Sequence, residues 1–241
     1  MLVLKDISWS LPEKKQILRN IDLTVGDGKC VVITGPNGVG KTTLAKIIAG
    51  IEQPESGKIM LDGRVINGLN VTERAQNGIA FAFQQPVRFK GLLVRDLMEL
   101  AAGCKLDEDA LCGALSQVGL CAREYIDREV NAGLSGGEIK RIEIATVLAR
   151  RARLSVFDEP EAGIDLWSFN NLIDVFQKLR REVEGSILII SHQKRILETA
   201  DEIVVVSGGR ITAQGTREEI MPQLFEAEDG RRACPLEREG D

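Results

Sequence analysis

The sequence predicts an α/β fold whose core is a parallel sheet, with an antiparallel β layer and an inserted helical subdomain. Three observations lead to this fold class. Residues 35–43 form a glycine-rich loop between an apolar run typical of a buried strand and a run with helical spacing. From residue 136 onward, helices alternate with apolar strands, the order that produces a parallel sheet covered on both faces. Between these parts, residues 86–133 show helical spacing without a strong strand, as expected for an insertion.

The first half of the chain supplies the antiparallel layer and the first core strands. Residues 3–9 and 17–25 alternate between apolar and polar side chains, and Leu61-Asp62-Gly63 forms a hairpin turn after residues 58–60. We expect these segments to pair beside the core. Residues 30–34 are the strand that enters the glycine-rich loop, and residues 44–49 are the helix that leaves it. A helical turn at 72–76 and a buried strand at 79–83, ending at Gln84, follow.

The second half supplies the subdomain and the remaining core. Its expected helices are 94–102, 108–118, 136–150, one that places Leu166, Phe169, Ile173 and Phe176 on one face, and 218–225. Its expected strands are 154–157, 187–190, 203–206 and 211–213, the last two joined by Gly208-Gly209. Residues 226–241 are charged and lack periodicity, so we expect a mobile tail.

Composition limits the functions that the chain can have. With 241 residues, 44% of them hydrophobic and 28% charged, it is typical of a soluble globular protein. The net charge of −5 argues against a nucleic-acid partner. No apolar run approaches the roughly 20 residues that cross a bilayer, and the first residues lack the form of a signal peptide, so a membrane would be reached only through a partner. Five cysteines without metal-ligand spacing favour a reducing, cytoplasmic location.

The glycine-rich loop predicts a nucleotide site. It fits the phosphate-binding pattern G-x-x-x-x-G-K-[ST] without substitution. Its glycines let backbone N–H groups turn toward an anion, and the helix N-terminus adds partial positive charge. Lys41 would reach the β- and γ-phosphates, and the Thr42 hydroxyl would bind Mg²⁺. The residues expected to hold ATP here are Gly35, Pro36, Asn37, Gly38, Val39, Gly40, Lys41, Thr42 and Thr43.

Two adjacent carboxylates follow the strand at 154–157. Because a buried pair of this kind is costly without a cationic partner, Asp158 is the natural ligand of the nucleotide's Mg²⁺. Glu159, next along, can act as general base toward the attacking water. The sequence therefore places catalysis at the end of this strand.

Residues 134–137, Leu-Ser-Gly-Gly, open the next informative helix. Ser135 and Glu138 form the capping box S-x-x-E. A cap does not require Gly136 and Gly137, and glycine weakens a first helical turn, so something should approach this backbone closely. A capped helix N-terminus with bare glycines predicts a second anion site.

The chain resembles ABC-type ATPases of the P-loop NTPase class, because it carries their motifs in the same order. These are the phosphate loop, Gln84, the LSGG stretch (residues 134–137), Asp158-Glu159, Asp165 and His192. The similarity runs from about residue 2 to residue 225. It implies an ABC ATPase domain at 1–225 that contains a helical subdomain at about 86–150. It also implies an ATP-dependent homodimer, in which each phosphate loop faces Ser135, Gly136 and Gly137 of the other subunit.

The resemblance assigns roles to further residues. Gln84 would sense the γ-phosphate and Mg²⁺, and Asp165 would lie in the loop at the dimer interface. His192, the only histidine, matches the family's switch histidine, which contacts the γ-phosphate and keeps water and Glu159 in register. The family often stacks an aromatic ring on adenine. Here the matching position is Leu11, with Trp9 two residues earlier, so the stacking residue stays open.

Two ABC classes are excluded by architecture. DNA-repair and chromosome-organising members insert a long coiled coil before the LSGG stretch, and translation-type members carry two ATPase domains in one chain. The remaining classes are transporter ATPases and the SUF-type iron–sulfur cluster assembly ATPase (SufC-like). Pro160 after Asp158-Glu159 is the usual transporter form.

Four stretches resemble the SUF-type ATPase instead. Residues 83–87 resemble its FQxPV, 137–144 its GGExKRxEI, 162–165 its SGLD and 191–197 its HxxRxL. On these stretches the favoured partner is a SUF-type scaffold protein (SufB- or SufD-like), which would supply the cluster ligands. The alternative is an ATP-binding subunit that acts on membrane subunits.

Overall fold

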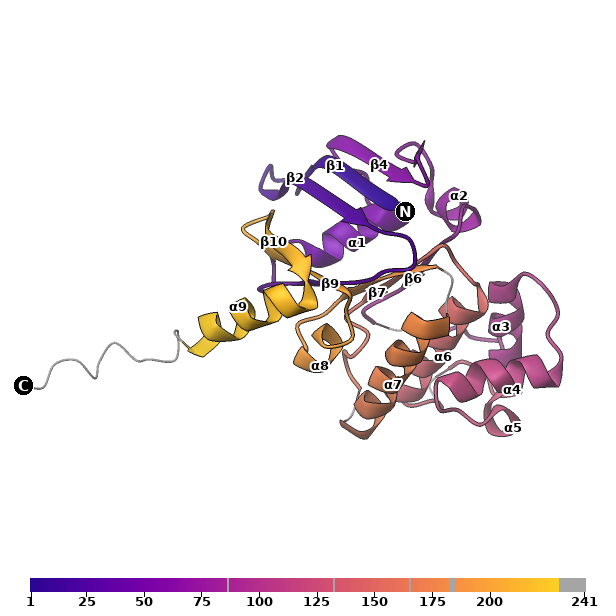
Figure 1. The fold of residues 1–241 in the computed structure, drawn as a ribbon. Coiled ribbons are helices and arrows are strands. Elements are labelled where there is room, and N and C mark those ends of the chain that lie inside the picture. The colour runs from indigo at the N-terminus through magenta and orange to yellow at the C-terminus, as the bar shows by residue number, and fades with distance from the viewer. Residues whose placement is uncertain (86, 132, 165, 183–184, 230–241) are drawn as a thin grey trace, which may run out of the picture.

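The computed structural model describes residues 1–85, 87–131, 133–164, 166–182 and 185–229 (Figure 1). Its strands are β1 (Leu2–Ser10), β2 (Gln16–Val25), β3 (Cys30–Thr34), β4 (Ser56–Leu61), β5 (Arg64–Val65), β6 (Ile79–Ala82), β7 (Leu154–Asp158), β8 (Ser186–Ile190), β9 (Glu202–Ser207) and β10 (Arg210–Thr216). Its helices are α1 (Lys41–Ala49), α2 (Val71–Gln76), α3 (Val94–Ala102), α4 (Glu108–Gln117), α5 (Ala122–Tyr125), α6 (Gly136–Ala149), α7 (Leu166–Glu182), α8 (Lys194–Leu197) and α9 (Arg217–Asp229).

The core sheet has the strand order β10-β9-β3-β8-β7-β6. β3 pairs in parallel with β8 and β9, and β7 pairs in parallel with β6 and β8, whereas β10 forms an antiparallel hairpin with β9. Every residue of β3, β7 and β8 is buried, as expected for parallel strands with helices on both faces. The predicted α/β core is therefore confirmed, and the loops after β3, β7 and β8 lie at one edge of the sheet.

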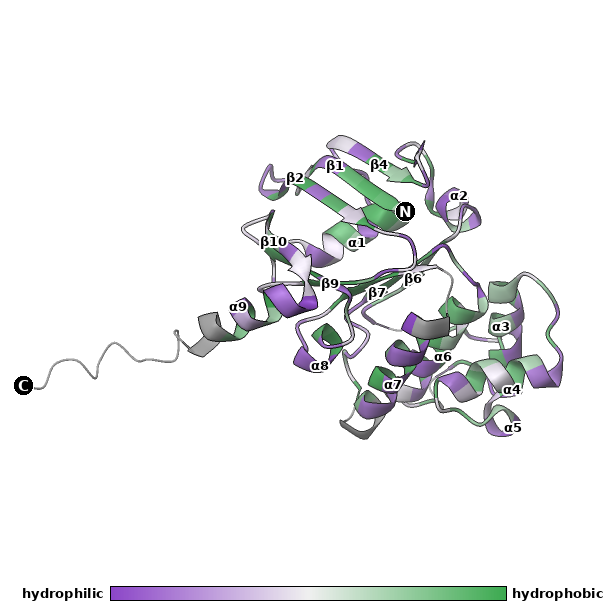
Figure 2. Cartoon of the chain, viewed as in Figure 1, coloured by the Kyte–Doolittle hydropathy of each residue, from purple (hydrophilic) through white to green (hydrophobic). Residues whose placement is uncertain are grey.

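The second sheet is the predicted antiparallel layer, with the order β2-β1-β4-β5. The expected hairpin turn joins β4 to β5, where Asp62 and Gly63 have φ angles of 50° and 77°. Over residues 20–25, β2 alternates between exposed and buried residues, and the β2 ribbon in Figure 2 carries both hydrophilic and hydrophobic colours. Its buried residues pack with α1, so α1 lies between this layer and the core sheet (Figure 1).

The helical subdomain contains α3, α4 and α5, and α6 connects it to the core. α6 contacts α3 and α4 on one side and β6 on the other. Apolar residues of all four helices join one hydrophobic cluster with β6, β7 and α7. A movement of α6 would therefore displace its contacts both in the subdomain and with β6, the edge strand of the core sheet.

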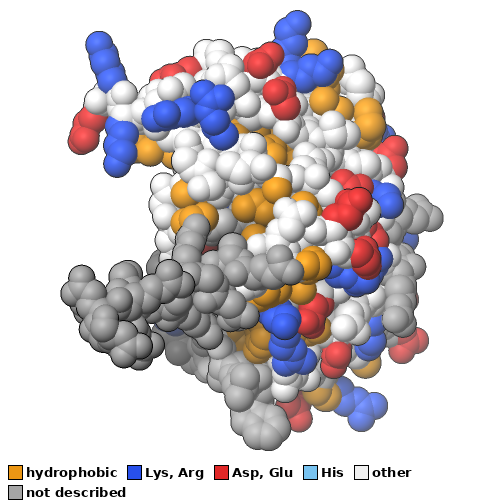
Figure 3. Space-filling view, turned by 60° about the vertical axis from the view of Figure 1, so that its left-hand side comes forward, with side chains coloured by type: hydrophobic (Ala, Val, Ile, Leu, Met, Phe, Trp, Pro, Cys, Tyr) orange, Lys and Arg blue, Asp and Glu red, His pale blue; other side chains and the backbone are white. Residues whose placement is uncertain are grey.

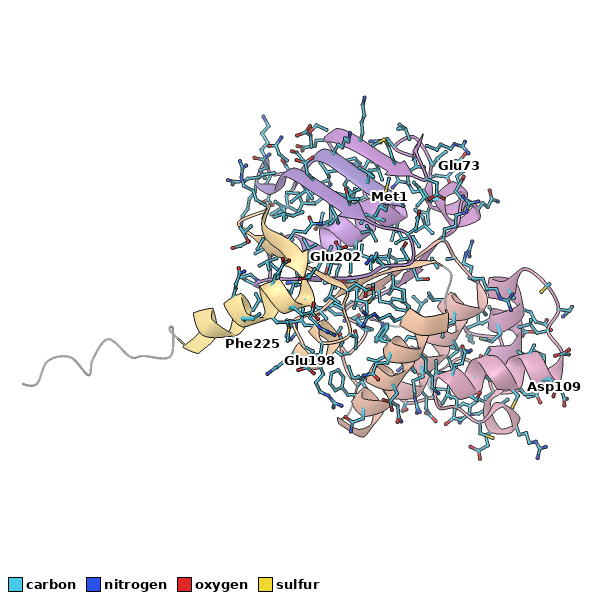
Figure 4. The ribbon with its side chains drawn as sticks, in the orientation of Figure 1. Met1, Glu73, Asp109, Glu198, Glu202 and Phe225 are labelled. Atoms are coloured by element: carbon cyan, nitrogen blue, oxygen red, sulfur yellow. The ribbon has the colours of Figure 1, made fainter. Side chains whose placement is uncertain are left out.

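Helix α9 is longer than the sequence predicted. It continues through Asp229, so the expected tail at 226–241 begins inside a helix, and residues 230–241 lie outside the described residues. The physical reason is that alanine and glutamate at 226–228 are good helix formers, and a charged composition does not end a helix. Phe225, labelled in Figure 4, fixes the helix against α8, where the Lys194 ammonium lies 4.6 Å from its ring centroid.

Among the residues whose burial the structure describes, Arg74 of α2 is the largest fully buried side chain, with no exposed surface. Its guanidinium donates hydrogen bonds to the carbonyls of Ile47 and Ile48, in the last turn of α1, and to those of Asn67 and Leu69. Burial lowers the pKa of Arg74 from its ordinary value. A capping box between Asn70 and Glu73, the latter labelled in Figure 4, holds the start of α2. The C-terminal carbonyls of α1 are thus satisfied by a buried cation.

Candidate nucleotide-binding site

The phosphate loop connects β3 to α1 and needs glycine at two positions. Gly35 has φ 139°, and a Cβ there would lie 2.0 Å from the carbonyl oxygen of Val206 in β9. Gly40 has φ 99°, and a Cβ there would lie 2.7 Å from Leu18 Cδ2 in β2. Both positions lie in the region that favours glycine, so the loop is held tightly between the two sheets.

Lys41 is buried at the start of α1, with 5% of its surface exposed. Its Nζ donates to the carbonyls of Gly35 and Pro36 at 2.7 and 2.9 Å. Burial lowers the pKa of the Lys41 ammonium, while Glu159 and Asp158 act in the opposite direction. The Lys41 ammonium therefore lies against the carbonyls of its own loop, near the carboxylates of Asp158 and Glu159.

Thr42 and Asp158 are brought together, as expected for ligands of one cation. The Thr42 hydroxyl donates to Oδ1 of Asp158 at 3.1 Å. Asp158 is 2% exposed, and burial raises the pKa of its carboxyl despite that hydrogen bond. These hard oxygen donors fit Mg²⁺. Within the described ranges, no three His, Cys, Asp or Glu residues gather as a complete cation site, so phosphate and water oxygens would complete the coordination.

Gln84 and Glu159 are also brought together. Nε2 of Gln84, just after β6, donates to Oε2 of Glu159 at 2.6 Å. Glu159 follows β7 with φ 43°, an unusual value for a residue with a side chain, and its N–H donates to the carbonyl of Ile190 in β8. The loop conformation and this hydrogen bond turn the carboxylate toward Gln84, across the mouth of the site.

These side chains border a cavity of about 400 Å³. It is lined by Trp9, Leu11, Ile17, Asn37, Gly38, Gly40, Lys41, Thr42, Thr43, Gln84 and Glu159. Its apolar wall comes from β1, β2 and the turn between them, and it contains both Trp9 and Leu11, so either can lie against a base. Ile17 belongs to the same wall and has no motif that would have marked it from the sequence.

His192 follows β8 but does not border this cavity in the part of the chain that the structure describes. Its side chain is exposed, and its Nε2 lies 3.4 Å from Nε2 of Gln193. Its neighbour Ser191 is buried and donates to Glu161, a carboxyl whose pKa is raised by burial. Sequence reasoning gave Glu161 no role, because only the fold brings it beside Ser191.

The LSGG stretch opens α6, and its predicted capping box is present. The Glu138 N–H donates to Ser135 Oγ at 3.2 Å, and the Ser135 N–H donates to Glu138 Oε2 at 2.7 Å. Gly136 is exposed, and a Cβ there would meet only the Gly163 carbonyl, at 3.8 Å. The described lining of the cavity includes none of these residues, so this helix N-terminus does not border the chain's own nucleotide cavity. Asp165 lies outside the described residues.

The cap of α6 predicts a pH dependence of stability. The Tyr125 hydroxyl donates to Glu138 and, with the Ser135 contacts, lowers the Glu138 pKa to about 2. This lies below the unfolded value of about 4.3, so the stabilisation is complete above that pH and is lost as the pH falls toward about 2. Tyr125→Phe keeps the ring under Arg128 but removes the donor. Between pH 5 and pH 3, we expect the free energy of unfolding, measured in urea, to fall less for this variant than for the wild type. An equal fall in the two proteins would contradict this prediction.

Comparison with known proteins agrees with this geometry. The model of the ABC transporter family matches residues 18–162, which include the phosphate loop, the LSGG stretch and Asp158-Glu159. The chain is an ATPase of the ABC family. An uncharacterized ABC transporter ATP-binding protein of Methanocaldococcus jannaschii, MJ0035, is 36% identical over 90% of this ABC ATPase and 89% of that protein.

A sulfate/thiosulfate import ATP-binding protein, CysA of Synechocystis, is 34% identical over 84% of this chain. The chain spans 57% of that relative's length. The dimeric cassette MJ0796, solved with ADP and phosphate, shares the fold of this ABC ATPase, with a TM-score of 0.78, 23% identity and coverage of 90% of this chain and 99% of that one. Over the residues that the structure describes, no helix is both long and apolar enough to span a membrane.

Proposed function

We propose that this ABC ATPase couples ATP hydrolysis to a conformational change in a partner that docks beside Gln84. The observation that carries this proposal is the position of Phe83, Gln84, Val87 and Phe89. Gln84 contacts Glu159 in the nucleotide site, and Phe83, Val87 and Phe89 border an apolar groove of about 190 Å³. The groove is lined by Phe81, Phe83, Val87, Phe89, Leu97, Ala101, Val130, Ile139, Ile142, Glu143 and Thr146.

The groove has the properties of a docking surface. Phe83 and Phe89 are 39% and 40% exposed, and Val87 is 43% exposed. Large apolar side chains that remain this exposed gain free energy when a partner covers them. A partner that inserts an apolar helix end here would contact Phe83, and therefore the segment that carries Gln84 to the γ-phosphate.

The partner that the comparisons favour is a membrane transport subunit. Relatives of the chain are named as import ATP-binding proteins, and these names support a membrane transport subunit as the partner. We propose a cytoplasmic location, because the cysteine usage suits a reducing compartment. The face in Figure 3 carries both basic and acidic side chains, and the absence of a nucleic-acid partner stays a prediction.

A soluble SUF-type scaffold is the second candidate partner. Its support is the resemblance of residues 83–87 and 137–144 to that family, two stretches that contact each other through Phe83, Lys140 and Glu143. In that case the chain would drive a change in a scaffold that itself holds the cluster.

The chemistry proposed for the nucleotide site is the same for both partners. The phosphate loop binds ATP, and Lys41 exchanges its carbonyl partners for phosphate oxygens. Thr42, Asp158 and Gln84 would hold Mg²⁺, which neutralises phosphate charge when bound. Glu159 takes a proton from the water whose oxygen bonds to the γ-phosphorus, while the bond to the β–γ bridging oxygen breaks to leave ADP. His192 is proposed to approach the γ-phosphate only in the closed dimer, together with Asp165 and the LSGG stretch of the partner copy.

The partner's identity is tested by affinity purification of the full chain from its native cells in ATP. Integral membrane proteins in the eluate support the transporter reading. Soluble β-rich proteins together with iron and sulfide support the cluster-assembly reading. If the chain purifies without any partner, even under mild detergent and low salt, the result would contradict both readings.

The docking surface is tested with charge reversals at Arg88 and Lys90, whose exposed side chains flank Phe89. We expect Arg88→Glu/Lys90→Glu to reduce partner-stimulated ATP hydrolysis about tenfold, with basal hydrolysis unchanged. Lys58→Glu in β4, an exposed reversal on the other sheet, is the matched control. An equal loss of basal and stimulated hydrolysis would show that residues 88–90 serve the fold rather than a partner.

A further inference from the structure

Lys140 and Glu143 form a buried ion pair on α6 that the chemistry above does not use. Lys140 has no exposed surface, and the Glu143 side chain is 15% exposed. Their charged groups form an ion pair with an N–O distance of 3.0 Å. Burial raises the pKa of Glu143, and the Lys140 charge opposes that shift. Burying two charges is costly, so their other contacts should explain why they are there.

Both side chains bind the main chain of one residue, Phe83. The Phe83 N–H donates to Oε1 of Glu143 at 2.8 Å, and the Lys140 ammonium donates to the Phe83 carbonyl. These bonds fix two successive peptide planes, and the second plane contains the Cα of Gln84. The Phe83 ring is fixed as well, because it packs edge-on against Phe81 with centroids 4.8 Å apart. An apolar pair of the same size could fill this space but could not hold the backbone.

We propose that Lys140 and Glu143 are positioning residues that keep the Gln84 amide on Glu159 and make residues 83–84 move with α6. The inference rests on the roles proposed for Gln84 and Glu159. The same helix begins at the LSGG stretch and borders the groove through Glu143. Rotation of α6, caused by nucleotide at its N-terminus or by a partner in the groove, is therefore transmitted to the catalytic carboxylate through Phe83.

Two double variants of the full chain separate positioning from burial. Lys140→Met/Glu143→Leu removes both charges and both hydrogen bonds to Phe83. Lys140→Met/Glu143→Gln also removes both charges but keeps an acceptor for the Phe83 N–H. We expect the first to lower kcat about 10- to 100-fold with the KM for ATP within about twofold of wild type, and the second to recover most of that loss. Arg150→Met, at the exposed end of the same helix, should leave kcat unchanged.

The deciding measurement combines these changes with Gln84→Ala. If the pair acts through Gln84, the Met/Leu substitutions cause no further loss of kcat in the Gln84→Ala protein. Two results would overturn the inference. One is a loss of kcat from the Met/Leu substitutions that adds independently to the loss from Gln84→Ala. The other is an equal loss of kcat for the Glu143→Leu and Glu143→Gln double variants. If the Lys140→Met/Glu143→Leu protein does not fold, the Lys140→Met/Glu143→Gln protein is used instead. Its smaller loss of kcat must likewise disappear in the Gln84→Ala background. Near wild-type turnover of Gln84→Ala alone would instead remove the role proposed for Gln84.

Discussion

Glu159→Gln is expected to lower ATP turnover by about 10²- to 10⁴-fold while ATP binding is retained. The substitution removes the base but keeps the shape of the side chain, and an amide oxygen can still accept the hydrogen bond from Gln84. Thr42 and Asp158, which would hold Mg²⁺, are untouched. Turnover is measured as phosphate release, and binding as the affinity for ATP with Mg²⁺.

Two further variants make this result specific. Lys41→Ala should lose affinity for the triphosphate, because it removes the ammonium that lies against the loop. Glu161→Gln makes the same chemical change two residues away, at a carboxylate held by Ser191, and should lower turnover far less. Hydrolysis by the Glu159→Gln protein at near the wild-type rate would show that the base has been assigned wrongly.

The second large effect concerns assembly. The chain offers two helix N-termini suited to phosphate, at α1 and at α6, but only the first borders the described nucleotide cavity. Pairing two copies head to tail uses both, because each nucleotide is then enclosed between one phosphate loop and the LSGG stretch of the other copy. Like charge on the two chains opposes closure, and hydrolysis removes the bridging γ-phosphate, so we expect the dimer to be transient.

The Glu159→Gln protein should therefore accumulate a dimer with ATP and Mg²⁺ that ADP does not support. Adding Ser135→Arg places a bulky side chain at the exposed start of α6 and should abolish the dimer, with nucleotide affinity of the single chain unchanged. Sedimentation of both variants in ATP measures this. If both stay monomeric, or both dimerise to the same extent, the shared-site model is wrong.

The parts of the site that the sequence predicted are those set by short, continuous segments. The phosphate loop, the cap of α6 and the carboxylates after β7 each lie within a few residues of one element, so spacing alone determines their local geometry. The sheet order placed Thr42 beside Asp158 and Gln84 beside Glu159, because parallel strands end at one edge.

Other features depend on contacts between distant segments and could not be predicted in this way. Residue spacing does not show that His192 lies off the cavity in the single chain, nor that Lys140 and Glu143 hold Phe83 from 57 and 60 residues away. The groove is formed where β6, α3 and α6 meet, and its exposure follows from packing rather than from any motif. The extension of α9 shows that a composition typical of tails does not set a helix end.

The guanidinium of Arg74 gives α1 an electrostatic asymmetry. An α-helix carries about half a positive charge at its N-terminus and half a negative charge at its C-terminus, and the latter weakens the field that an anion feels at the former. In this chain the negative pole of α1 is neutralised by a full positive charge that solvent and salt cannot reach. The negative pole of α1 therefore weakens the attraction of its N-terminus for phosphate less, and this asymmetry is built into the interior of the fold.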